Sequence, residues 1–351
     1  MSTRVASGAI AVLLAGVTGA QTTPPALAPE PSAKADASVP VEVFKAPLRK
    51  RVDAPAYPLG ERKQGRDGWV NLNFMIDPQG KPYEIMVTDS TGNKALEQAA
   101  VEAARDWEFE PATLDGVPID AGQNMKVNFV LTGESGANSA FVSAYKKFVA
   151  ATKANDRAKA DAALARMRVQ NLYEDAFFNL AQFEYARQWG TKPQQLAAIK
   201  RAIAEERNAD YLPKSAFLAG LEILLGLQID TNDFAGAMNT YDKLRNLAEP
   251  QTLAKYENLI GQITNLRSES SPYAVTGDFG DSTSWYFLLF RKRFQINLAS
   301  GRIAEIKLRC DKRYVFFKYD PEVMYTIADK YGSCSMELVG EPGTQFKLIQ
   351  S

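Results

Sequence analysis

The stretch Gly68-Trp69-Val70-Asn71-Leu72-Asn73-Phe74-Met75-Ile76, followed by Asp77-Pro78-Gln79-Gly80, decides the fold of the first part of this chain. Apolar residues at every second position from Val70 to Ile76 alternate with other residues, which is the period of a strand with one buried face. Pro at the second position and Gly at the fourth suit a type I turn. The turn predicts an antiparallel partner strand with Ile85 and Val87 on its inward face.

The period changes between Asn93 and Trp107, where alanines and apolar residues recur every three to four positions, as on one face of a helix. Asn93 predicts the N-cap, and Pro111 prevents the helix from continuing. The helical stripe consists of Leu96, Ala99, Ala100, Ala103 and Trp107. A last alternating run, Met125 to Leu131, closes the segment. We therefore expect two strands, a helix and a third strand, with the helix covering one face of a small antiparallel sheet.

The segment also carries several short motifs in a fixed order. They are the Tyr57-Pro58 start, the strand from Gly68, the turn at Asp77, the helix exit Asp106-Trp107-Glu108-Phe109-Glu110-Pro111-Ala112 and the closing strand. In combination these motifs resemble the C-terminal domain of the TonB energy-transducer family. The resemblance covers residues 55–131, about a fifth of the chain, and each motif alone would be a weak signal.

The resemblance implies a function for one edge of the predicted sheet. In that family the closing strand pairs with an extended segment of an outer-membrane receptor, which is β-augmentation. It therefore implies a non-enzymatic binding protein that supports transport, with an outer-membrane receptor or another envelope protein as partner. The implied partner-binding residues are Tyr57, Pro58, Gln123, Met125, Lys126, Val127, Asn128, Phe129, Val130 and Leu131. The alternative is that Met125, Val127 and Phe129 are only core and that the next domain blocks the edge.

The N-terminus predicts export. Residues 5–20 are an unbroken run of apolar and small residues after Arg4, shorter than the ~20 residues that span a bilayer comfortably. Thr18-Gly19-Ala20 fits a signal-peptidase site, so residues 1–20 are expected to be a cleaved signal peptide and the protein periplasmic. An uncleaved inner-membrane anchor is the alternative, with an inner-membrane proton-channel complex as a further partner. Transducers of this family carry a histidine in that helix, whereas this chain has no histidine.

The next two segments differ in composition. Residues 21–54 are rich in Pro and Ala and predict a disordered linker. Residues 137–269 read as helix throughout and predict short helical hairpins, as in an α-solenoid. The expected helices lie near 138–153, 156–169, 172–188, 193–207, 211–228, 233–247 and 250–267. The stretch Asn232 to Leu244 loosely resembles the first helix of a tetratricopeptide repeat. Helices of this kind are expected to present a groove to another protein; the alternative is that they act as a spacer.

Residues 273–351 return to strand-like sequence. We expect a small β-sandwich or barrel of five or six strands, in which Trp285 to Phe290 is buried between two layers. Cys310 and Cys334 are the two cysteines of the chain. An exported protein meets oxidising conditions, so the pair predicts a structural disulfide. The functional alternative is a redox or metal-binding role for the two cysteines, but their spacing is not C-x-x-C.

Composition excludes several function classes. Without histidine there is no Ser-His or Cys-His dyad and no histidine metal ligand. No glycine motif for phosphate binding is present. We therefore predict no catalytic, cofactor-binding or metal-binding residues, although chemistry by Asp and Glu alone stays open. Lys plus Arg and Asp plus Glu balance at 41 each, so no nucleic-acid partner is implied.

Together these patterns predict an α+β multidomain protein. Its folded domains are expected at 55–133, 137–269 and 273–351. The leading function is TonB-like binding of a receptor segment in support of transport. The alternative is a periplasmic scaffold that uses the same fold and the helical repeats for protein–protein interaction, without energy transduction.

Overall fold

The computed structural model of the protein describes residues 42–131, 136–204, 211–269 and 271–351. The predicted signal peptide and residues 21–41 of the predicted linker lie outside the described residues. Residues 42–351 form one compact unit. The division of this unit into three domains therefore stays a prediction.

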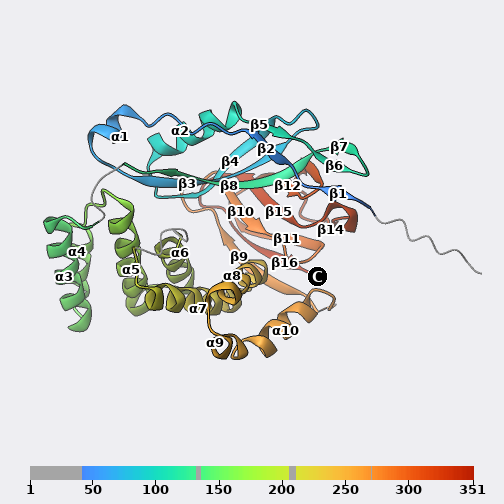
Figure 1. Cartoon of the computed structure of the whole chain (residues 1–351). Helices are drawn as coiled ribbons and strands as arrows, with labels where there is room; N and C mark the ends of the chain where they lie inside the picture. Colours follow the sequence, from blue (N-terminus) through green and yellow to red (C-terminus); the bar gives the residue numbers. More distant parts are fainter. Residues whose placement is uncertain (1–41, 132–135, 205–210, 270) are drawn as a thin grey trace, which may run out of the picture. The chain divides into compact units, whose positions relative to one another are not determined.

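The first part of this unit contains the predicted strand–strand–helix–strand segment. Its elements are β1 (Phe44–Lys45), β2 (Leu48–Arg51), α1 (Leu59–Lys63), β3 (Gly68–Ile76), β4 (Pro82–Ser90), α2 (Lys94–Arg105), β5 (Glu108–Glu110), β6 (Ala112–Leu114), β7 (Val117–Ile119) and β8 (Ala121–Phe129). The main sheet is antiparallel with the order β4-β3-β8. Helix α2 lies against β3 and β4 (Figure 1). The closing strand begins and ends earlier than predicted, at Ala121 and Phe129 rather than at Met125 and Leu131.

Helix α2 begins where the sequence predicts. The Asn93 side chain accepts hydrogen bonds from the N–H groups of Ala95 at 3.0 Å and Leu96 at 3.4 Å, as an N-cap does. The helix buries Leu96, Ala100 and Ala104 against the sheet. It ends at Arg105, ahead of Pro111, and the chain turns into β5.

Two short strands replace part of the predicted disordered linker. β2 pairs with β5, and β1 pairs with β6. The prediction of disorder up to residue 54 is therefore wrong for residues 44–51. The side chains of β2 are all exposed, so this strand is held by backbone pairing and leaves no apolar alternation in the sequence.

The middle of the chain is helical. Its elements are α3 (Ser139–Lys153), α4 (Arg157–Leu164), α5 (Leu172–Trp189), α6 (Lys192–Ala202), α7 (Lys214–Asp230), α8 (Phe234–Leu247), α9 (Pro250–Ala254) and α10 (Glu257–Leu266). Consecutive helices pack as pairs: α3 with α4, α5 with α6, and α7 with α8. The last predicted helix, 250–267, is two helices. The solenoid arrangement stays a prediction. In the described part of the chain, no helix has both the length and the apolar character to cross a membrane.

The last part is built from strands. They are β9 (Tyr273–Asp278), β10 (Ser284–Leu288), β11 (Arg293–Ser300), β12 (Ile303–Cys310), β13 (Arg313–Lys318), β14 (Tyr325–Thr326), β15 (Cys334–Gly340) and β16 (Gln345–Gln350), with a 3-10 turn, η2, at Asp329–Tyr331. They form two antiparallel sheets, β10-β15-β12-β13 and β14-β11-β16-β9, which share one core. This exceeds the five or six strands expected, and the choice between sandwich and barrel stays open. β10 is an edge strand of its sheet with half-buried side chains: Trp285 and Phe287 pack against the core of the two sheets, whereas Tyr286 and Leu288 line a cavity with helices α7 and α8. The strand thus lies between two layers, but its burial is only partial.

A disulfide joins Cys310 to Cys334, as the sequence predicted. The two residues are direct partners on the neighbouring strands β12 and β15. Their side chains are 1% and 5% exposed. The bond therefore lies inside the core that the two sheets share.

Strand β3 is buried on both faces, whereas the sequence predicted one buried face. On the face away from α2, Trp69 is 1% exposed, Asn73 3% and Met75 0%. The chain itself covers this second face: the ring of Tyr83 in β4 meets the ring of Tyr314 in β13 edge-on, with centroids 5.8 Å apart. Two-sided burial therefore arises from packing between distant parts of the sequence.

Candidate functional site

The outer edge of β8 is the most distinctive feature of the first part. In the described part of the chain β8 pairs only with β3. The carbonyl of Trp69, in β3, points to the β4 side, where it accepts a hydrogen bond of 3.1 Å from the N–H of Thr91. Asn128 lies opposite Trp69 in the β3–β8 ladder. Because backbone groups alternate sides along antiparallel strands, Asn128, Lys126 and Asn124 direct their N–H and C=O groups outward.

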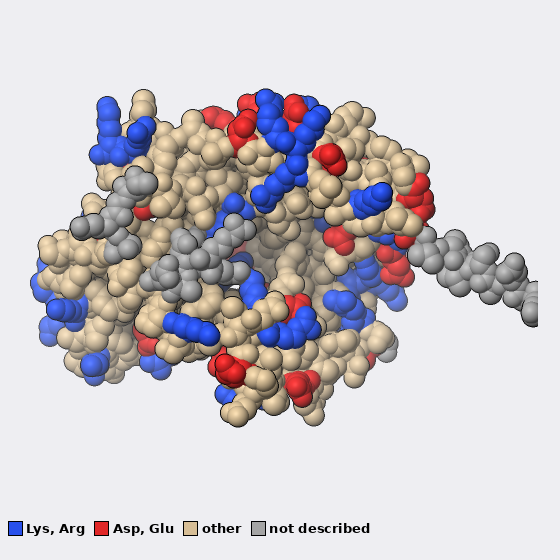
Figure 2. Space-filling view, viewed as in Figure 1, with Lys and Arg blue, Asp and Glu red and all other residues tan. Residues whose placement is uncertain are grey.

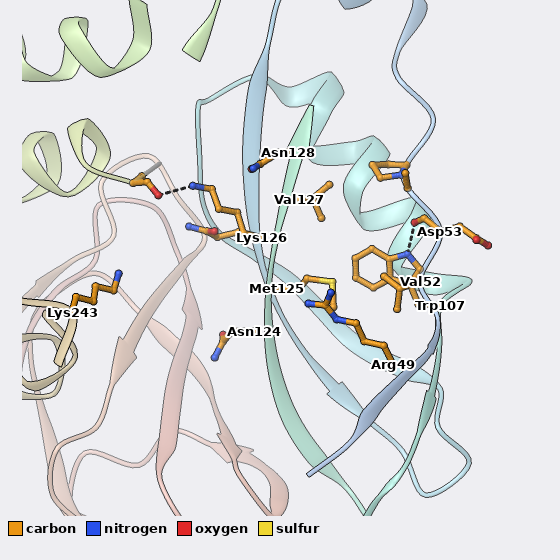
Figure 3. A pocket seen from close by; sticks show the side chains of 14 residues that line it. Arg49, Val52, Asp53, Trp107, Asn124, Met125, Lys126, Val127, Asn128 and Lys243 are labelled. Carbon is orange, nitrogen blue, oxygen red and sulfur yellow. Dashed lines mark hydrogen bonds between the residues drawn. The ribbon is translucent and has the colours of Figure 1, made fainter. Parts of the chain in front are cut away.

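A cavity of about 610 Å³ lies along this edge (Figure 3). Strand β8 contributes the consecutive residues 124–128 to it. The wall on the α2 side is lined by Val52, Asp53, Ala54, Pro55 and Trp107. The wall on the side of the middle helices is lined by Asn71, Ala204 and Lys243. Figure 3 shows Trp107 and Lys243 on opposite sides of β8. The edge therefore runs between a mostly apolar wall, which includes Asp53, and a more polar one.

Trp107 fixes the wall on the α2 side. Its Nε1–H donates a hydrogen bond of 2.9 Å to the backbone carbonyl of Asp53. The indole is 2% exposed and meets the ring of Phe74 edge-on, at 5.8 Å between centroids. Val52 packs against the same core. The segment from Val52 to Pro55 is thus held beside β8 by the core of the sheet.

Lys126 joins the edge to the helical part of the chain. Its Nζ donates a hydrogen bond of 2.6 Å to the carbonyl of Ala204, just after α6, and lies 4.7 Å from the centroid of the Trp69 ring. Arg49 and Lys243 are the other cationic side chains among the described lining residues, against Asp53 as the carboxylate. Figure 2 shows Lys and Arg side chains around a hollow on this face of the molecule.

Tyr57 lies at the far end of β8, outside the cavity. Its ring meets Phe129 edge-on at 5.6 Å, and its hydroxyl donates to the carbonyl of Arg66 at 2.5 Å. Burial, followed by the nearby charge of Asp67, raises the pKa of Tyr57 to about 12, so the hydroxyl stays a donor at neutral pH. Pro58 is the N-cap of α1. These two residues anchor the start of the segment.

The structure separates the predicted partner-binding residues into groups. Met125, Lys126, Val127 and Asn128 line the cavity. Gln123 precedes them on β8, and Val130 and Leu131 lie beyond the end of the strand. Like Met125 and Val127, Phe129 belongs to the core on the α2 side. The side chains at these three positions are thus core, as the alternative proposed, while the outward backbone between them faces the cavity. Partner binding by the whole set stays a prediction.

Sequence reasoning missed several lining residues. Asn124 was omitted, although it is exposed and shares the outward period of Lys126 and Asn128. The strand period was a signal that would have found it. Arg49, the segment 52–55, Ala204 and Lys243 were also missed. They come from separate parts of the chain, and no spacing in the sequence connects them to β8.

Comparison with known proteins locates the similarity in this same segment. Residues 53–131 match the family model described as Gram-negative bacterial TonB protein C-terminal. The resemblance seen in the sequence is thereby confirmed for this segment. The helices from α3 onward and strands β9 to β16 lie outside the match.

Two curated relatives are similar over comparable lengths. The chain is 36% identical over 96 residues to Protein TonB of Vibrio cholerae serotype O1, which covers 27% of this chain and 39% of that protein. It is 37% identical over 78 residues to Protein tonB2 of Pseudomonas aeruginosa, which covers 22% of this chain and 29% of that protein. The chain therefore spans well under half the length of these relatives.

Among solved structures, the chain is similar to the solution NMR structure of the Pseudomonas aeruginosa TonB CTD. The sequence identity is 24%, and the match covers 25% of this chain and 90% of that chain with a TM-score of 0.23. A score at this level carries no argument about function.

Proposed function

We propose that residues 53–131 form a TonB-type recognition module that binds an extended segment of an outer-membrane receptor by strand addition to β8, in support of receptor-dependent transport. The outward backbone groups of Asn124 and Asn128, which border a cavity, support this proposal. In strand addition the main-chain hydrogen bonds supply affinity, and pockets for alternate side chains supply selectivity. The two walls of the cavity differ in polarity, so they could select alternate side chains of a bound strand.

The rest of the proposal concerns where and how the module acts. The protein acts in the periplasm as a non-enzymatic binding protein, without a cofactor or metal. Residues 1–20 direct its export, as a cleaved signal or as an inner-membrane anchor. Only an anchored chain would also contact an inner-membrane proton-channel complex.

A second candidate function is a periplasmic scaffold. The observation that favours it is that helices α3 to α10 and strands β9 to β16 lie outside the matched residues 53–131 and could offer further surfaces for binding. The scaffold predicts crosslinks to envelope-assembly or cell-wall components and no uptake defect on deletion of the gene. Transport support predicts the uptake defect.

The direct test compares two substitutions at one edge position. Synthetic peptides tiled across the N-terminal segments of the outer-membrane receptors of the same organism are titrated against the full chain by calorimetry. Asn128→Pro removes an outward N–H without removing a hydrogen bond to β3 and should weaken binding at least tenfold. Asn128→Ala keeps the N–H and should bind like the unaltered protein. Circular dichroism verifies that both variants fold.

Each result decides a separate point. If folded Asn128→Pro binds as tightly as Asn128→Ala, the outer edge of β8 is rejected as the binding site. If no receptor peptide binds the unaltered protein, receptor recognition itself is rejected.

A further inference from the structure

A second cavity, of about 700 Å³, lies in the last part of the chain and shares no lining residue with the cavity beside β8. Its walls come from the end of α10, the turn between β10 and β11, and the segment from Ile327 through η2 to the start of β15. Small-molecule sites usually have volumes of roughly 300–1,000 Å³. The cavity is therefore large enough for a small organic ligand.

Cationic side chains make up much of the charged lining of this cavity. They are Arg267, Arg291, Lys292 and Arg293. In the part of the chain that the structure describes, none of the four forms an ion pair. Glu269, Asp311 and Asp329 line the same cavity without pairing with them, and Lys292 donates a hydrogen bond to the carbonyl of Gly332 instead. The positive charges therefore lack a carboxylate partner within the described chain and would attract an anion.

Arg291 is the buried member of this group, at 3% exposed. Its Nε donates to the carbonyl of Leu266 at 2.6 Å, and its Nη1 donates to the carbonyls of Ser271 at 2.6 Å and Gln350 at 3.3 Å. These neutral acceptors hold the guanidinium in place but do not neutralise its charge. Its Nη2 has no hydrogen-bond partner among the described residues. Because a buried charge without an opposite charge is costly, an anion in the cavity would stabilise Arg291.

Arg267 and Arg293 are the exposed arginines of the cavity. The guanidinium of Arg267 lies 4.9 Å from the centroid of the Phe290 ring. A planar guanidinium can donate two parallel hydrogen bonds to one carboxylate. Leu289, Phe290 and Ile327 add apolar surface to the lining. The cavity thus combines donors for an anionic head group with apolar side chains for a carbon skeleton.

We infer that this cavity binds a small organic carboxylate. The inference does not depend on strand addition to β8. Arg267 and Arg293 contact the carboxylate, and Arg291 contributes the field of a buried positive charge. A phosphate monoester carries about 1.5 to 2 negative charges at pH 7. Asp311 and Asp329 in the lining repel that additional charge, so the site favours a carboxylate over a phosphate.

The test uses benzoate, benzamide and phenyl phosphate, which share one ring and differ in the head group. Each probe is titrated against the isotope-labelled full chain, and NMR follows the backbone N–H signals of residues 289–293 and 332–334. Benzoate should shift these signals until the site is saturated. Benzamide lacks the charge and should bind about tenfold more weakly, because charge-assisted hydrogen bonds are the stronger ones. Phenyl phosphate should also bind more weakly than benzoate.

Two substitutions identify the arginines that contact the probe. Arg267→Gln and Arg293→Gln should each weaken benzoate binding about fivefold, since each removes a charged donor. Arg313→Gln is the matched control, because Arg313 is exposed but does not line the cavity. The control should bind benzoate like the unaltered protein. Circular dichroism verifies that all three variants fold.

The comparison of the probes needs no variant, so it decides the matter even if a variant does not fold. Equal affinities for benzoate and benzamide, or no saturable shift with benzoate, would overturn the site. Unchanged benzoate binding in folded Arg267→Gln and Arg293→Gln would do the same. Tighter binding of phenyl phosphate than of benzoate would overturn the assignment to carboxylates.

Discussion

Glu84 and Lys307 are separated by 223 positions in the sequence, and the Glu84 carboxylate lies 2.9 Å from Nζ of Lys307. The same carboxylate reaches Arg309, whose side chain is 2% exposed. Beside them the rings of Tyr83 and Tyr314 meet edge-on. These contacts make the second face of the β4-β3-β8 sheet an internal interface of the protein. Several expected outcomes depend on this interface.

Glu84→Gln should lower the free energy of unfolding by about 1.5–3 kcal/mol, the range for hydrogen bonds to charged groups. The substitution keeps the shape of the side chain but removes the charge that Lys307 and Arg309 share. Urea denaturation measures the change. Glu108→Gln is the matched control, because the Glu108 side chain is about as exposed as that of Glu84 but pairs with Arg51 and Lys81, whose side chains are more than half exposed. That control should hardly change stability, and equal losses in the two variants would contradict the prediction.

The contribution of Glu84 should depend on pH. Burial opposes its ionisation, but the hydrogen bond and charge of Lys307, together with Arg309, outweigh burial, so the pKa of Glu84 lies below its ordinary 4.5. A carboxylate whose pKa is lowered by folding stabilises the protein fully above the unfolded-state pKa, and this stabilisation is lost as the pH falls through the folded-state pKa. The difference in Tm between the unaltered protein and Glu84→Gln should therefore be full at pH 7 and shrink below about pH 4.5. A gap that stays constant down to pH 3 would argue against the ion pair.

Loss of the disulfide should destabilise the last part of the chain. Cys310 and Cys334 are 24 positions apart, and closing a loop of this size stabilises by roughly 3 kcal/mol in the chain-entropy model. Reduction with dithiothreitol should lower the urea midpoint of the unaltered protein. The double variant Cys310→Ala/Cys334→Ala should start from the lower midpoint and not respond to the reductant. A reductant response in the double variant would point to a cause other than this bond.

The second face of β3 can be tested with two methionines. Met75 is 0% exposed and Met324 is 43% exposed. Met75→Ala should lower the free energy of unfolding by about 2–5 kcal/mol, as for buried methionines in general. The same substitution at Met324 should change it by less than about 0.5 kcal/mol, as is usual at the surface. Equal effects would mean that the face is open to water.

Local patterns in the sequence predicted local structure well. The alternation from Val70 to Ile76 predicted β3, and Asn93 was correctly predicted as the N-cap of α2. Most helices of the middle part begin and end within a few residues of their predicted bounds. In each case the signal lies within one element, because side-chain period and capping depend on neighbouring residues.

Contacts between distant segments could not be predicted in the same way. Strand β2 has only exposed side chains, so its backbone pairing with β5 leaves no apolar pattern. In a strand with one buried face, Asn73 and Met75 would be exposed to solvent. Packing against the rest of the chain buries them instead. For the candidate site, the strand β8 was predictable. The wall that contains Lys243 was not, because only the folded chain brings α8 to that edge.

Burial of both faces of β3 has a practical consequence for dissection of the molecule. A fragment limited to residues 53–131 would leave Trp69 and Met75 facing solvent. Exposed apolar patches of this kind promote self-association. Such a fragment would therefore be a poor substitute for the intact polypeptide in affinity measurements. Its self-association could be mistaken for binding of a partner.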